Sequence, residues 1–424
     1  MRELRAIIAA NRSGQPLALP SVCSAHPDVL AATLLAAEAA DLPILIEATS
    51  NQVNQHGGYT GLTPDRFVAF VHDLCDRNAV ARERVLFGGD HLGPQAWHDQ
   101  PAEAAMAEAA TLVADYVRAG FAKIHLDCSE GCAGEPTHPG DAVVAARAAA
   151  LAEVCERAAP VAGAISYMFG TEVPPPGGAR AGEGADTVPP TDPAAATATI
   201  DAHAAAFAAR GLEDAFSRAV GLVVQPGLEF APDHVMAFDT AAPDLLSPVL
   251  ERHPHMAFEA HSTDYQAPAV FPALARRHFA VLKVGPALTF ACRQALYALD
   301  GLAGWLGRSG PSLAEAMETL MAGDNRYWAR HYQGTAEELR LLRHFGYADR
   351  IRYYWPAPAA QAAVAALFAT LDGARLPEPL LLQYFAAPVL ARAEALVAPG
   401  RSLARALVLA EIQEAYAPYL ACQK

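Results

Sequence analysis

The chain has 424 residues, more than the roughly 250 that a single α/β barrel commonly takes. Its formal net charge of −15 argues against the basic surface that nucleic acids or anionic membranes require. Seven cysteines, an odd number in a chain without a recognisable secretory leader or an apolar membrane span, argue against a disulfide framework. We therefore expect a cytoplasmic protein that binds neither nucleic acid nor membrane.

Short apolar runs alternate with longer Ala-rich amphipathic stretches, which is typical of βα units around a buried parallel sheet. The predicted strands are residues 17–23, 43–49, 84–90, 123–127, 164–170, 220–227, 256–262 and 280–286. Eight such units predict closure into an α/β fold of the TIM barrel type. The doubly wound alternative is disfavoured because no G-x-G-x-x-G segment follows the first strand.

Two segments depart from this alternation. Residues 173–192 are dense in Pro and Gly and predict a long loop over the end of the barrel. Beyond about residue 290 the strand-like runs stop and helical patterns continue to the end. We predict a barrel with a metal and substrate site over residues 1–290, and a helical extension over residues 291–424 packed on that barrel.

Ionisable side chains gather at the ends of four predicted strands, and a barrel of parallel strands brings those ends to one pocket. Burial of a carboxylate or an imidazole without a partner costs several kcal/mol, which favours a wet pocket or a metal over a place in the core. A structural histidine is the alternative for any one position. The residues expected to converge are Asp90, His91, His125, Asp127, Glu172, Glu259 and His261.

Two histidines and a carboxylate with one open position form a common catalytic site for a divalent ion. We assign His91, Glu172 and His261 as ligands of Zn, Mn or Ni, with His125 as the main competitor.

Two acids would then be free for proton transfer, because a carbonyl polarised by a metal acidifies its neighbours and a carboxylate must take the proton. These acids are Asp90 and Asp127. Glu47, at the end of the second predicted strand, is either a further pocket acid or a partner for sugar hydroxyls.

Neutral donors and acceptors crowd the stretch ATSNQVNQHGGYTG after the second strand, which suits a polyol, although a solvated turn is the alternative. Lys283 is the candidate cation for a phosphate, or else a Schiff-base lysine, which would leave the histidines and acids unexplained. Arg352 in DRIRYYWP is expected to anchor the helical extension on the barrel, and contact with a substrate phosphate is the alternative. The candidate substrate-binding residues are Asn51, Gln52, His125, Ser262, Asp264, Lys283 and Gly285.

Several blocks together resemble one family, the accessory subunits of tagatose-bisphosphate aldolase. The blocks are SVCSAHP, LIEATSNQVNQHGGYTG, GGDHLGP, FAKIHLD, GTEVPPPGG, VVQPGLEF, FEAHSTDYQ, LKVGPALTF and DRIRYYWP. The resemblance implies a barrel related to class II ketose-bisphosphate aldolases, in which an Asp-His pair and two later histidines form the metal site. Asp90 and His91 match that pair and His261 matches the last histidine, whereas Glu172 stands where the aldolases have the middle histidine.

The resemblance implies one of two functions. The first is an accessory subunit of a class II tagatose-bisphosphate aldolase, with a divalent-metal site for a ketose phosphate and a catalytic aldolase subunit as partner. The second is a self-sufficient, metal-dependent 4-epimerase of ketohexoses or their 6-phosphates, and a module that only senses sugar phosphates is a third possibility. We expect a homo-oligomer, and we discount kinase activity because the chain has no G-x-x-x-x-G-K-[ST] segment.

Overall fold

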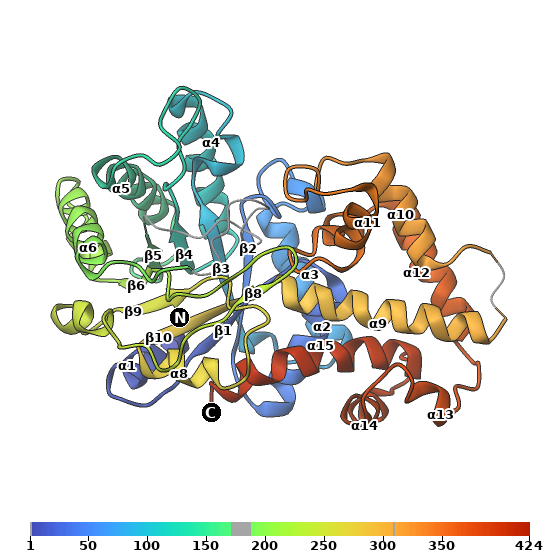
Figure 1. The fold of residues 1–424 in the computed structure, drawn as a ribbon. Helices are drawn as coiled ribbons and strands as arrows, with labels where there is room; N and C mark the ends of the chain where they lie inside the picture. Colours follow the sequence, from blue (N-terminus) through green and yellow to red (C-terminus); the bar gives the residue numbers. More distant parts are fainter. Residues whose placement is uncertain (1, 171–187, 308–309) are drawn as a thin grey trace.

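The structure, a computed structural model, describes residues 2–170, 188–307 and 310–424. Eight parallel strands close into a barrel in the order β1-β10-β9-β6-β5-β4-β3-β2 (Figure 1). They are β1 (Leu19–Cys23), β2 (Ile44–Thr49), β3 (Val85–Leu92), β4 (Lys123–Leu126), β5 (Ser166–Phe169), β6 (Ala219–Val223), β9 (Ala257–Ala260) and β10 (Phe279–Val284). The predicted TIM barrel is confirmed, and each strand falls within or beside its predicted run.

Helices follow the strands and cover the outside of the barrel (Figure 1). They are α2 (Pro27–Ala40), α3 (Pro64–Arg77), α4 (Ala102–Arg118), α5 (Asp141–Ala158), α6 (Pro193–Ala208), α7 (Glu213–Phe216) and α8 (Val270–Arg276). Short 3₁₀ turns lie at η1 (Gly58–Thr60), η2 (Arg82–Arg84), η3 (Pro94–Trp97) and η4 (Ser247–Arg252), and β7 (Glu229–Phe230) pairs with β8 (Val235–Met236) in an antiparallel ribbon. Because helices cover the strands, the faces that pack against the helices are apolar, as the hydrophobic runs predict.

An apolar plug closes the amino-terminal end of the barrel. Helix α1 (Arg2–Arg12) buries Leu4 and Ile8 against inward-facing aliphatic residues of the strands, including Leu45 and Val281. Arg5 of the same helix donates to Ser166 Oγ at the start of β5, at 3.0 Å. This end of the barrel is therefore packed with apolar side chains, and the polar strand ends lie at the opposite, carboxyl end.

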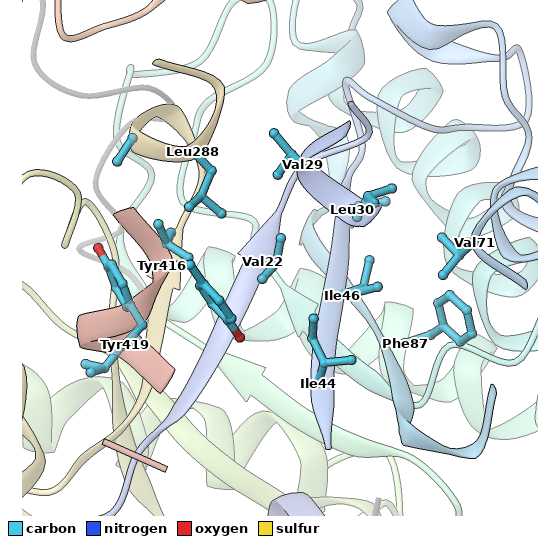
Figure 2. Packing of buried hydrophobic residues seen from close by; sticks show 14 of the residues in the cluster. Val22, Val29, Leu30, Ile44, Ile46, Val71, Phe87, Leu288, Tyr416 and Tyr419 are labelled. Carbon is cyan, nitrogen blue, oxygen red and sulfur yellow. The ribbon is translucent and has the colours of Figure 1, made fainter. Parts of the chain in front are cut away.

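After β10 the chain is helical. The helices are α9 (Pro286–Trp305), α10 (Leu313–Gly323), α11 (Ala336–Phe345), α12 (Pro358–Leu371), α13 (Glu378–Leu381), α14 (Ala387–Leu396) and α15 (Leu403–Ala421), with the 3₁₀ turn η5 (Arg350–Tyr354). Helix α15 packs against α9, α14 and α2. Tyr416 and Tyr419 of this helix belong to the same buried hydrophobic cluster as Val22 of β1 (Figure 2), so α15 contributes to the hydrophobic layer around the barrel.

Parts of the predicted organisation stay predictions. The division at residue 290 is not marked by a break, since β10 leads into α9 at Pro286. Most of the predicted loop, residues 173–187, lies outside the described residues. Among the helices that the structure does describe, none combines the length and apolarity needed to cross a bilayer.

Candidate active site

Strand β3 directs two consecutive side chains into the barrel. Neighbouring residues in a regular strand face opposite sides, yet Asp90 and His91 both line the pocket at the carboxyl end. The pairing of β3 with β4 shifts register between Gly89 and Leu92, and His91 adopts a left-handed φ of 48°. Such a conformation costs a non-glycine residue about 1–3 kcal/mol and is often found at functional sites. This local irregularity is what turns both groups inward.

Two glycines around this pair make room for acids of neighbouring strands. A Cβ on Gly88 would lie 2.5 Å from Glu47 Oε1, and a Cβ on Gly93 would collide with the carbonyl oxygen of Asp127. The GGDHLGP motif therefore combines the inward pair with two positions where only glycine fits.

Three buried imidazoles face one another, with ring centroids 5.1 to 5.4 Å apart for every pair. One nitrogen of each ring lies against a carboxylate from a strand end. The three contacts are His91 Nδ1 with Asp127 Oδ2 at 2.7 Å, His125 Nδ1 with Asp90 Oδ1 at 2.9 Å, and His261 Nε2 with Glu259 Oε1 at 2.9 Å. Histidines that bind metals commonly have such a carboxylate on the second nitrogen, because it fixes the ring and raises its basicity.

His125 and His261 belong to a cluster that could hold a divalent cation, whereas His91 lies outside that cluster and its Nε2 is 3.5 Å from Asp90 Oδ2. His125 Nε2 is buried and has no hydrogen-bond partner among the described residues, a costly state for an imidazole nitrogen in the interior. Ligand atoms of His125, His261, Asp90 and Glu259 lie within 4.8 Å of one another. The site therefore has the donor types and the spacing of a possible metal site, with imidazole nitrogens as the borderline-soft ligands that Zn and its neighbours prefer.

Two lysines hold the acids together beneath the imidazoles. Lys123 Nζ lies 2.5 Å from Glu47 Oε1 and 2.6 Å from Glu259 Oε2, and all three side chains are fully buried. Lys283 Nζ lies 2.7 Å from Glu47 Oε2 and also forms an ion pair with Asp90. We call this set the floor cluster: Glu47, Asp90, His91, Lys123, His125, Asp127, Glu259, His261 and Lys283. Four carboxyl groups face two lysines in it, which leaves negative charge for a cation to balance.

The pKa values follow these contacts. Burial raises the pKa of Asp90, but His91 and Lys283 outweigh it and hold that pKa well below its ordinary value. Burial lowers the pKa of His261 to about 3, so this ring is neutral and can act as a ligand. Burial opposes the charge on Lys283, but Asp90 and nearby acids raise its pKa well above the ordinary value. Lys283 is therefore a cation at neutral pH, which disfavours its use as a Schiff-base nucleophile.

The pocket above the floor cluster collects most of the predicted substrate-binding residues. Those that line it are Asn51, Gln52, Ser262, Asp264, Lys283 and Gly285, together with Asp90, His91 and His261. Glu47 and His125 are fully buried below them. Asp264 Oδ1 accepts hydrogen bonds from the backbone of Gly285 and Ala287, so it is already bonded to the first turn of α9.

Some positions differ from the expectation. Asp127 was expected to be free for proton transfer, but its carboxylate contacts His91 and accepts from Ser129 Oγ at 2.6 Å. Lys283, the expected phosphate cation, is engaged by acids. Glu172, the expected middle ligand, lies outside the described residues, and His125 occupies the position among the imidazoles.

Sequence reasoning missed three contributors. Lys123 was not assigned a role in the site, although a lysine inside an apolar strand is itself a signal of a buried ion pair. Cys23, at the end of β1, lines the pocket with its sulfur 3.7 Å from Glu47 Oε2. Tyr353 lines the same pocket from η5, and no local pattern in the sequence places it there.

The comparisons with known proteins cover the barrel and the extension together. A family model described as D-tagatose-1,6-bisphosphate aldolase subunit GatZ/KbaZ-like matches residues 4–424. A curated relative from Agrobacterium fabrum, D-tagatose 6-phosphate 4-epimerase, is 52% identical over 385 residues, 90% of each chain. A solved structure from Sinorhizobium meliloti 1021, described as a probable tagatose 6 phosphate kinase, is 47% identical with a TM-score of 0.86 and covers 96% of this chain and 100% of that one.

Proposed function

This chain belongs to the D-tagatose-1,6-bisphosphate aldolase subunit GatZ/KbaZ-like family, and from that premise we propose that it acts on tagatose-type ketohexose phosphates in the cytoplasm. The activity that the geometry supports best is a self-sufficient, metal-dependent 4-epimerase. The observation that carries it is the triad of buried imidazoles, each paired with a carboxylate at the floor of a pocket. A subunit that served only as a scaffold would gain nothing from burying this many ionisable groups, since their desolvation is costly.

We assign His91, His125 and His261 as ligands of a divalent ion, Zn, Mn or Ni. The predicted set had Glu172 in place of His125. When bound, the ion would supply a Lewis acid that polarises the ketose oxygens. Asp127, Asp90 and Glu259 orient the three rings through their second nitrogens.

Inversion at carbon 4 constrains the role of the protein's acids. The hydrogen on carbon 4 is β to the carbonyl at carbon 2, so it is not acidified, whereas cleavage of the bond between carbons 3 and 4 leaves its electron pair next to the carbonyl. In this route a base takes the proton of the carbon 4 hydroxyl, the bond breaks to an enediolate and an aldehyde, and the enediolate adds to the other face of the aldehyde. The new hydroxyl regains the proton, so atoms and electrons balance.

We propose Asp90 as the base that accepts the proton of the carbon 4 hydroxyl. It lines the pocket, and Lys283 and the imidazoles favour its carboxylate form before reaction. Lys283 lies beside it and stabilises the negative charge that the carboxylate carries. Asp127 and Glu47 are assigned positioning roles, because Asp127 holds His91 and Glu47 holds both lysines.

The test uses the purified chain alone. Protein stripped with a chelator is incubated with D-fructose 6-phosphate or D-tagatose 6-phosphate and with Zn, Mn, Ni or no added metal, and the sugars are separated. We expect interconversion of the two phosphates that disappears on chelation and returns with one of the metals. Absence of conversion with every metal would rule out the self-sufficient epimerase.

A second candidate is favoured by the family description, which names an aldolase subunit. Here the chain would be the accessory partner of a catalytic tagatose-bisphosphate aldolase subunit, with the metal and substrate site retained. This function predicts no turnover by the chain alone and a rise in aldolase activity when the two subunits are mixed. Size-exclusion chromatography of the chain alone and of the mixture would give the oligomeric state, for which we expect a homo-oligomer.

A further inference from the structure

The lysine expected to bind a phosphate is not available for one. Lys283 Nζ lies within 4 Å of carboxylate oxygens from Glu47, Asp90 and Glu259. A phosphate placed on this ammonium group would meet three carboxylates at close range. The electrostatic repulsion between like charges in a buried site is large, so the phosphate of a ketose phosphate must be bound elsewhere.

One other Lys or Arg side chain lines the pocket among the described residues, and it is Arg352 of η5. Its guanidinium donates to the carbonyl oxygens of Ala348 and Asp349 and, at 3.0 Å, to the phenol oxygen of Tyr353. None of these partners is an anion. An arginine that is pinned by neutral acceptors keeps its full positive charge and a fixed orientation, which suits recognition of a phosphate.

Two buried carboxylates interact electrostatically with this arginine and also contact other groups, although Asp349 Oδ1 has no hydrogen-bond partner among the described residues. Asp349 accepts from Thr289 Oγ1 at 2.5 Å and lies 3.7 Å from Arg293 Nε. Asp264 accepts from two backbone N–H groups at the start of α9. None of the hydrogen bonds described for Arg352 goes to a carboxylate, so its guanidinium can still bind an anionic ligand.

Tyr353 adds a second donor. Two guanidinium groups lie over its ring, with Arg350 Cζ 4.3 Å and Arg352 Cζ 4.5 Å from the centroid. Both arginines donate to its oxygen, at 3.3 and 3.0 Å. These bonds occupy both acceptor positions of the phenol, so its O–H must point away from the arginines. Arg350 is itself held by the carbonyl oxygen of Tyr327 at 2.6 Å.

We propose that Arg352 and Tyr353, positioned by Arg350, form the subsite for the phosphate of the sugar substrate. We call these three residues the arginine wall. The inference deepens the proposed function and rests on it: the reacting carbons lie at the floor cluster, and the phosphate end of the chain lies against the arginine wall. The barrel alone would lack this subsite, because all three residues belong to the part of the chain that follows β10.

The test compares substrates with and without a phosphate. Wild type, Arg352→Gln and Arg352→Lys are assayed with D-fructose 6-phosphate and with D-fructose. We expect kcat/KM for the phosphorylated sugar to fall on the order of 100-fold in Arg352→Gln, since a charged hydrogen bond is lost, while the value for fructose changes less than about threefold. In Arg352→Lys the fall in kcat/KM for the phosphorylated sugar should be smaller, because lysine keeps the positive charge but lacks the planar guanidinium that can form two parallel hydrogen bonds.

The matched control is Arg405→Gln. Arg405 also lies over an aromatic ring in the helical part, with its Cζ 4.2 Å from the Phe368 centroid. It is not among the residues that line the pocket, and its side chain is 47% exposed. Its kinetics should match wild type with both sugars. An equal loss with both sugars in Arg352→Gln, or no loss with either, overturns the proposal.

A binding measurement separates this proposal from the proposed function. Thermal unfolding of wild type and the variants is followed with increasing inorganic phosphate or D-fructose 6-phosphate. If wild type turns over neither sugar, the epimerase function fails, while the subsite stands if the phosphate ligand stabilises wild type and not Arg352→Gln. An equal response of the two proteins, or no response of wild type, overturns the subsite. Should Arg352→Gln fail to fold, Tyr353→Phe and Arg352→Lys give the same comparison with a smaller expected shift.

Discussion

The floor cluster and the arginine wall hold charge beside the same pocket in opposite ways. In the floor cluster both lysines contact carboxylates and each imidazole has a carboxylate beside one ring nitrogen, so the acids outnumber the lysines and every charged group has a charged neighbour. In the arginine wall the guanidinium groups donate to carbonyl and phenol oxygens, and no carboxylate is among these hydrogen-bond partners. This difference is the basis of our two proposals, a cation bound at the floor cluster and an anion bound at the arginine wall.

The largest expected effect comes from removing the imidazole with the unpartnered nitrogen. His125→Ala should lose bound metal and reduce epimerase activity on the order of 10⁴-fold, because several kcal/mol of transition-state stabilisation depend on the ion. Metal content by mass spectrometry and kcat with D-fructose 6-phosphate check this. Full metal occupancy in the variant would contradict our ligand assignment.

The second prediction concerns the buried ion pairs of Lys123 in the floor cluster. Lys123→Met leaves Glu47 and Glu259 without one of their two ammonium partners in a fully buried site, which should lower the free energy of unfolding by about 3–5 kcal/mol. Equilibrium unfolding in urea measures this change in the free energy of unfolding. The exposed Lys424 is the matched control, and Lys424→Met should change stability by less than about 0.5 kcal/mol. Equal stabilities of the two variants would show that the ion pairs do not hold the floor.

The third prediction concerns a buried acid that has no lysine. Burial raises the pKa of Glu229 to about 7, above its ordinary value of 4.5, and its bonds to Phe230 N–H and Ser262 only partly oppose this. The folded state therefore binds a proton more tightly than the unfolded state. Stability from this group is present below about pH 4.5 and is lost as the pH rises towards 7, by on the order of 3 kcal/mol.

Glu229→Gln isolates this effect, because the amide keeps the shape of the side chain without titrating. The difference in unfolding free energy between wild type and variant, measured from pH 4.5 to 8, should move in favour of the variant as the pH rises. A difference that stays constant with pH would mean that Glu229 does not titrate in this range.

The smallest expected effect comes from weakening one carboxylate behind an imidazole. Asp127→Asn keeps a hydrogen-bonding group next to His91 but loses its charge, so metal affinity should fall about 10- to 100-fold with the fold intact. Competition with a chromophoric chelator measures the affinity. Ser129→Ala, which removes only the hydroxyl that donates to Asp127, should change it far less.

Local pattern was sufficient for the architecture. The eight apolar runs that became the barrel strands are short and separated by amphipathic stretches, and four of them lead into ionisable residues, so the strand number, the parallel pairing and the end that carries the site could be predicted from the local pattern. The barrel and the family membership are confirmed. The convergence of Asp90, His91 and His261 on one pocket was also predictable, since strand ends of a closed barrel must meet.

The partners within the site depended on the tertiary structure. The register shift in β3 turns Asp90 and His91 to the same side, which a strict alternation of side chains does not predict. It brings His91 to Asp127, and the closed barrel brings Lys123 of β4 between Glu47 of β2 and Glu259 of β9, on three strands far apart in the chain.

By itself, the sequence determined an eight-stranded barrel with histidines and acidic residues at its carboxyl end, because strand periodicity and composition are properties of neighbouring residues. Only the tertiary structure decided that Lys283 is occupied by three acids and that Arg352, seen in the sequence mainly as a packing anchor, lines the pocket. The physical reason is that a charge's role depends on the counter-charges within a few ångströms, and these come from segments that the chain brings together only on folding.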